Sequence, residues 1–68
     1  MINIYSNTFE CPNGQKYRCV VAAENINQIR DILKEELTTD IPYSMSAWKK
    51  ENIRHEFTSP TFIGEYLC

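Results

Sequence analysis

The sequence predicts a small α+β domain in which one helix packs on a mostly antiparallel sheet, in the order β-β-α-β-β-β. Three observations predict this class. Two segments rich in β-branched and aromatic residues flank a turn at Pro12-Asn13-Gly14. Apolar residues then recur at helical spacing, and the rest of the chain returns to an alternation with a period of two. A length of 68 residues, 43% of them hydrophobic, leaves room for one domain, residues 1–68.

The first two predicted strands form a hairpin. They cover residues 2–9 and 16–23, and the proline, asparagine and glycine between them suit a tight turn. The second strand has apolar side chains on both faces in its latter half, where residues 19–23 form the longest apolar run of the chain. A strand with two apolar faces is expected to be central in the sheet.

The next segment predicts a helix over residues 26–38. Asn25 can cap the first free amides of this helix, and Gln28 completes a capping-box pattern. The helix is expected to end before Pro42, because the residue before a proline avoids the helical conformation. Its apolar stripe consists of Ile26, Ile29, Leu33 and Leu37.

Three further strands are expected after the helix. Residues 43–48 alternate between apolar and polar side chains, which predicts a half-buried strand, and a short helix capped by Ser46 is the alternative. A polar turn is predicted at residues 49–52, a strand at residues 53–57 and the last strand at residues 61–67.

Two details complete the predicted fold. Gly64, inside the last predicted strand, indicates either a bulge or a closely approaching neighbour. The predicted core consists of Ile4, Val21, Ile29, Leu33, Leu37, Phe57 and Ile63.

The residues that could carry chemistry do not form a catalytic or metal-binding motif. Cys11, Cys19, His55 and Cys68 would make a set of four zinc ligands, but no two of them have the short spacing of zinc sites. The single histidine lies on a predicted strand, and no nucleophile, phosphate-loop or metalloprotease motif occurs. The sequence therefore predicts a protein that is not an enzyme, with three free thiols and no cofactor.

The start of the chain and its thiols predict a cytoplasmic protein. The first residues lack the basic and apolar segments of a secretory signal, and no apolar run is long enough to cross a membrane. An odd number of cysteines without a CxxC pair is typical of a reducing compartment.

The predicted binding site is the polar turn and its flanks. Trp48, Lys49, Lys50 and Arg54 place a large rigid side chain among cations, at positions that the predicted fold does not need for packing. Such residues favour binding to an acidic protein surface. They also favour the alternative of single-stranded nucleic acid, which Lys16 and Arg18 would support, although the net charge is −2.

Two other interpretations of the surface stay open. The acidic end of the predicted helix, with Glu35, Glu36 and Asp40, could meet a basic partner surface. The chain could also be a structural or self-associating module, as a monomer or a homodimer.

The layout of the chain resembles that of a known class of small proteins. A strand pair leads through Val20-Val21-Ala22-Ala23-Glu24-Asn25 into a helix, and further strands end at Cys68. In size and element order this resembles small proteins of bacteriophages and mobile elements, among them anti-CRISPR proteins. The resemblance covers most of the chain and rests on no diagnostic motif. It implies an inhibitor in the bacterial host cytosol that binds a host effector stoichiometrically, such as a CRISPR–Cas complex, and blocks nucleic-acid access.

Overall fold

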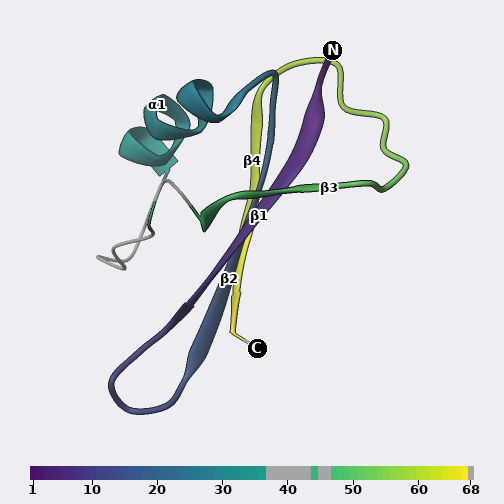
Figure 1. The fold of residues 1–68 in the computed structure, drawn as a ribbon. Helices are drawn as coiled ribbons and strands as arrows, with labels where there is room; N and C mark the ends of the chain where they lie inside the picture. The colour runs from purple at the N-terminus through teal and green to yellow at the C-terminus, as the bar shows by residue number, and fades with distance from the viewer. Residues whose placement is uncertain (37–43, 45–46, 68) are drawn as a thin grey trace.

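A four-stranded antiparallel sheet carries the helix on one face (Figure 1). The computed structural model describes residues 1–36, 44 and 47–67. The strands lie in the order β3-β1-β2-β4, which confirms the α+β class and the central position of β2. In the described part of the chain, two strands follow the helix where three were predicted. The elements are β1 (Asn3–Glu10), β2 (Lys16–Ala23), α1 (Ile26–Glu36), β3 (Lys49–Glu51) and β4 (Thr61–Leu67).

The β1–β2 hairpin forms as predicted, because its turn satisfies its own backbone. The amide of Cys11 donates to the carbonyl of Gln15, and the amide of Gly14 donates to the carbonyl of Cys11. The Asn13 side chain accepts from the amide of Gln15 at 3.0 Å. Gly14 has a φ of 89°, a conformation in which a side chain would be strained. These bonds fix the pairing register of the two strands.

The predicted cap starts α1. The Asn25 side chain accepts from the amide of Gln28 at 3.1 Å, and the Gln28 side chain accepts from the amide of Glu24 at 2.7 Å. This reciprocal pair satisfies two amides at the helix N-terminus. The helix is described to Glu36, so the predicted last residues 37–38 lie outside the described part of the chain.

Alternation along the strands divides the core into two clusters on opposite faces of the sheet. The helix side holds the larger cluster, and the other face holds a small cluster near the N-terminus. The first consists of Tyr5, Cys19, Val21, Ala23, Ile29, Leu33 and Trp48, with Ile32 and Phe62 packed against it. The second consists of Ile2, Ile4 and Ala22, with Val20 and Ile63 beside it.

Most of the predicted core is confirmed. Ile4, Val21, Ile29 and Leu33 are buried, and Ile63 is half-buried against the smaller cluster. Leu37 lies outside the described residues. The prediction that Phe57 belongs to the core is wrong, because its side chain is 39% exposed in the loop between β3 and β4.

The segment between α1 and β4 differs most from the prediction. Residues 49–52 were expected to form a turn, but Lys49–Glu51 pair with β1 as the edge strand β3. A short edge strand needs only backbone pairing and tolerates charged side chains, which explains the missed assignment. The strand expected at residues 53–57 is also wrong, since these residues form a loop. Within the predicted strand 43–48, Ser44, Ala47 and Trp48 are described and lie outside any strand, and the other positions are not described.

His55 ties this loop to the start of the chain. The loop passes close to the N-terminus (Figure 1), where His55 Nε2 lies 3.0 Å from the carbonyl oxygen of Ile2. His55 Nδ1 accepts from the amide of Phe57 at 3.2 Å, so Nε2 carries the proton and donates to Ile2. Both ring nitrogens are therefore engaged with backbone groups, which gives His55 a structural role.

The predicted irregularity at Gly64 is confirmed. The pairing of β2 with β4 shifts between Val20 and Val21, which leaves Ile63 as the extra residue of a bulge. A Cβ added at Gly64 would lie 3.1 Å from the hydroxyl oxygen of Tyr66. The Tyr66 ring therefore covers the backbone of Gly64 on the face opposite the helix.

The helix in the described part of the chain is too short and too polar to cross a membrane.

Candidate binding site

The structure separates the four residues predicted to bind a partner. Trp48 was expected to be exposed, but its side chain is only 6% exposed and belongs to the core cluster beneath α1. The residue directly before β3 points toward the helix side, since side chains alternate along a strand and Lys50 pairs with the core residue Tyr5. The expectation that Trp48 is a free anchor for a partner is therefore corrected.

The three cations of the predicted site point in different directions. Lys49 pairs with Ser6 and lies on the face opposite the helix, whereas Lys50 pairs with Tyr5 and lies on the helix side. Arg54 is exposed in the loop between β3 and β4. The predicted cluster is thus not one surface, and of these three cations only Lys49 lies beside Ser6 and Glu51 on the face opposite the helix. A binding role for Lys49, Lys50 and Arg54 stays a prediction.

The structure gathers a different set of polar side chains on the sheet. The pairing register places Thr8, Arg18 and Tyr66 in one row across three strands, next to the row of Lys49 and Ser6. All of them lie on the face opposite the helix, beyond the small apolar cluster. We call this surface the polar sheet face, and it consists of Ser6, Thr8, Arg18, Lys49, Glu51 and Tyr66.

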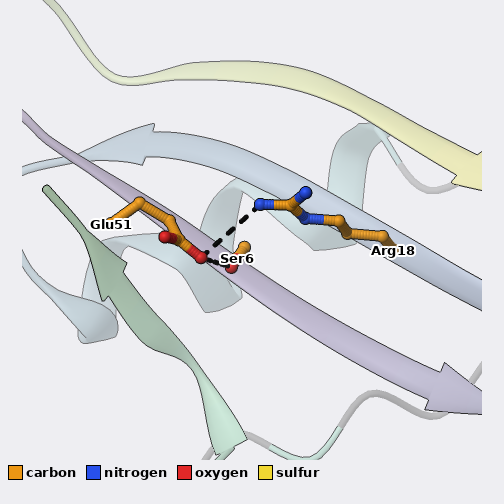
Figure 2. Close-up of polar contacts among 3 residues, drawn as sticks. All are labelled: Ser6, Arg18 and Glu51. Atoms are coloured by element: carbon orange, nitrogen blue, oxygen red, sulfur yellow. Dashed lines mark hydrogen bonds and ion pairs between the residues drawn. The ribbon is translucent and has the colours of Figure 1, made fainter. Parts of the chain in front are cut away.

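Glu51 orders the centre of the polar sheet face. In Figure 2 the side chains of Arg18 and Glu51 point toward one another across β1. One carboxylate oxygen of Glu51 accepts from the hydroxyl of Ser6 and lies 3.5 Å from an Arg18 nitrogen. The Arg18 side chain is 47% exposed, so this pair adds about 0–1 kcal/mol to stability. The pair places one guanidinium nitrogen of Arg18 beside the Glu51 carboxylate.

A shallow hollow lies in this face and is open to solvent. Its volume is about 350 Å³, and its described lining comes from β1, β2, β3 and the residue before Trp48. Tyr66 is not part of this lining; it pairs with Arg18 from the neighbouring strand β4 and is 51% exposed. The lining residues are Ser6, Asn7, Thr8, Arg18, Ala47, Lys49 and Glu51. The hollow thus offers two cations, a carboxylate and hydroxyl groups to a polar partner.

The described members of the possible zinc set, Cys11, Cys19 and His55, do not come together. Cys11 follows the end of β1, whereas His55 contacts Ile2 just before its start, so the length of an eight-residue strand separates them. Cys19 is buried in the core cluster, and Cys68 lies outside the described residues. The described residues contain no group of three or more potential metal ligands.

The two described thiols are expected to react very differently. Burial and the neighbouring Glu65 carboxylate raise the pKa of Cys19 to about 12 from an ordinary value of 9.0. Because the thiolate is the nucleophile, Cys19 of the folded protein should resist alkylation at pH 8, while the half-buried Cys11 reacts. Mass spectrometry of iodoacetamide-treated C68S protein should show label on Cys11 alone. Label on Cys19 at the same rate under native conditions would contradict the packing of β2 beneath α1.

The same pKa shift sets a pH dependence of stability. The unfolded chain loses the Cys19 proton near its ordinary pKa of 9.0, whereas the folded chain keeps it to about 12. Proton loss thus favours the unfolded state at alkaline pH. The contribution of Cys19 to stability is complete below pH 9 and declines as the pH rises above it.

Comparison with known proteins gives no match: no family model, no curated protein and no solved structure is similar to this chain.

Proposed function

We propose that this chain is a non-enzymatic binding module that inhibits a protein partner by stoichiometric contact through the polar sheet face. The observation that supports this proposal is the ordered set of Arg18, Glu51 and Ser6 at the centre of that face (Figure 2). The partner class that the layout of the chain implies is a host effector, such as a CRISPR–Cas complex, in the bacterial cytosol.

The physical argument for this proposal compares two exposed surfaces that could bind a partner, the outer side of α1 and the polar sheet face. The helix uses its apolar stripe against the sheet, so its outer surface consists of flexible charged side chains that lose entropy when they are fixed. The polar sheet face instead presents side chains on a rigid sheet. Arg18 and Lys49 would attract an acidic surface of the partner, and Tyr66 supplies apolar area at low entropic cost.

The first test reverses the two cations of this face. The double variant Arg18→Glu, Lys49→Glu should bind a partner purified by affinity capture from a bacterial lysate about tenfold more weakly, since charged contacts would become repulsive. Its melting temperature should fall by only a few degrees, because the variant loses the exposed Arg18–Glu51 pair but no core side chain. Calorimetric titration of the purified partner measures affinity and stoichiometry together.

The matched control reverses the two other cations of the predicted site. Lys50→Glu, Arg54→Glu changes the net charge by the same amount but lies off the polar sheet face. The proposal expects this control to bind as the wild type does. Loss of binding in the control together with normal binding of the Arg18, Lys49 variant would move the interface to the loop and the helix side.

Single-stranded nucleic acid is a second candidate, which the exposed Tyr66 ring beside Arg18 favours. Small sheets bind single strands by stacking bases on aromatic rings and contacting phosphates with cations. Lys16 lies two residues before Arg18 in β2, on the same face, and could extend such a path. Retention of the protein on single-stranded DNA or RNA that weakens steeply with salt would support this function, and loss of retention in Tyr66→Ala would place it on this face.

A further inference from the structure

The two hydrogen bonds of His55 can be made by only one form of its ring. The Nε2 atom lies 3.0 Å from the carbonyl oxygen of Ile2, and a carbonyl oxygen can only accept. The Nδ1 atom accepts from the amide of Phe57, with the two nitrogens 3.2 Å apart. The ring is therefore neutral and carries its hydrogen on Nε2, and each of its nitrogens has a backbone partner.

The charged groups around this ring come from three segments. The loop between β3 and β4 carries Arg54 and Glu56 on either side of His55. The start of the chain adds the amino group of Met1, and Glu24 directly follows β2. Within the described part of the chain, none of these groups forms an ion pair with the ring. The two backbone bonds therefore decide which form of the ring this loop accommodates.

Protonation of the ring acts on only one of these two bonds. It adds a hydrogen to Nδ1 and turns this atom from an acceptor into a donor. Two donors then face one another, so the bond from the amide of Phe57 cannot form. The Nε2 atom keeps its hydrogen, so the bond to Ile2 remains and becomes charge-assisted. Histidine is the side chain whose ordinary change of charge falls between about pH 5 and pH 8.

We propose that His55 is a proton-controlled switch in the loop between β3 and β4. The neutral ring joins the backbone of Phe57 to that of Ile2 through its two nitrogens. The charged ring stays bound to Ile2 and releases the amide of Phe57. The contribution of the released bond is complete above the range in which histidine titrates and is lost as the pH falls through it.

The switch changes the surface of the loop and leaves the sheet in place. Phe57 is 39% exposed, and its ring centroid lies 5.9 Å from that of His55. Release of its amide frees this aromatic side chain from its position beside the histidine ring. Neither residue belongs to the two core clusters, so the strands and the helix keep their packing. This inference does not depend on the proposed binding function.

NMR spectroscopy of isotope-labelled full-length protein between about pH 8 and pH 5 tests this switch. The ring nitrogen resonances of His55 should identify the form with its hydrogen on Nε2 at the upper end of this range. The protection factor of the Phe57 amide, its exchange rate relative to an unstructured chain at the same pH, should fall about two- to tenfold, as expected for the loss of one hydrogen bond. This fall should follow the titration of the ring, while the amides of β2 keep their protection.

His55→Asn is the matched control, because an asparagine oxygen can accept from the amide two residues on and takes up no proton in this range. The Phe57 amide of this variant should keep its protection factor, and any effect of the Met1 amino group would appear there as well. A neutral ring with its hydrogen on Nδ1, a constant Phe57 protection factor in the wild type, or an equal fall in His55→Asn would overturn the inference. Simultaneous loss of protection in all strands would also overturn it, since acid would then unfold the domain. If the variant does not fold, the wild-type ring form and protection factor decide the matter.

Discussion

Replacing Trp48 with alanine is expected to lower the free energy of unfolding by about 3–5 kcal/mol, the cost of removing a large buried aromatic side chain. Trp48 is 6% exposed and belongs to the same cluster as Ile29, Leu33 and Tyr5. Domains of this size have a total stability near the lower end of about 5–15 kcal/mol. The variant should therefore be largely unfolded at physiological temperature. Urea denaturation followed by far-UV circular dichroism measures the loss without needing the tryptophan signal.

Two neighbouring substitutions make this result specific to the core. Lys50→Ala changes an exposed residue two positions away and should alter stability by less than about 0.5 kcal/mol. Trp48→Phe keeps part of the buried area and should fall between the wild type and Trp48→Ala. Wild-type stability of Trp48→Ala combined with weakened partner binding would instead place the tryptophan at an interface.

Replacing Leu33 with alanine has the second-largest expected effect, a loss of about 2–5 kcal/mol. Leu33 is 8% exposed and is, with Ile29, one of the two buried residues of α1. Its removal leaves a cavity between the helix and the sheet. Lys34→Ala, one position along the same helix, keeps the helical propensity and should stay close to wild type. Thermal denaturation of both variants tests whether this stripe attaches α1 to the sheet, and equal melting temperatures would show that it does not.

The elements specified by neighbouring residues could be predicted from the sequence. The turn around Gly14 satisfies its own hydrogen bonds, and the Asn25–Gln28 cap lies within four residues of chain. The two faces of β2 indicated a central strand, and its position between β1 and β4 confirms this. In each case the decisive interaction is local or is set by the alternation of side chains.

The segment after the helix depends on distant residues and could not be predicted. Lys49–Glu51 form a strand only because β1 is available to pair with them. The alternation of Ile53, His55 and Phe57 suggested a strand. In the structure these residues form a loop, and a hydrogen bond from the His55 side chain to the carbonyl of Ile2, which is distant in sequence, holds this loop at the start of the chain. A run of charged residues is compatible with both a turn and an edge strand, so composition alone did not separate the two.

The polar sheet face could not be predicted without knowing the pairing register of the strands. Arg18, Glu51 and Tyr66 are far apart in the sequence and come together because β1 and β2 pair with β3 and β4. Sequence reasoning noted Arg18 as a supporting cation and missed Tyr66 and Glu51. A signal existed for Tyr66, since it lies two residues after Gly64 on the same side of a predicted strand, and an aromatic ring in that position can cover the glycine.

Hydroxyl-radical footprinting of the complex with the captured partner tests the proposed interface most directly. Tyr66 on the polar sheet face and Phe57 in the loop are both exposed aromatic residues, 51% and 39% respectively, so each reports on its own surface. The proposal predicts that the oxidation rate of Tyr66 falls on complex formation while that of Phe57 stays as in the free protein. Protection of Phe57 with an unchanged rate at Tyr66 would contradict a partner bound to the polar sheet face.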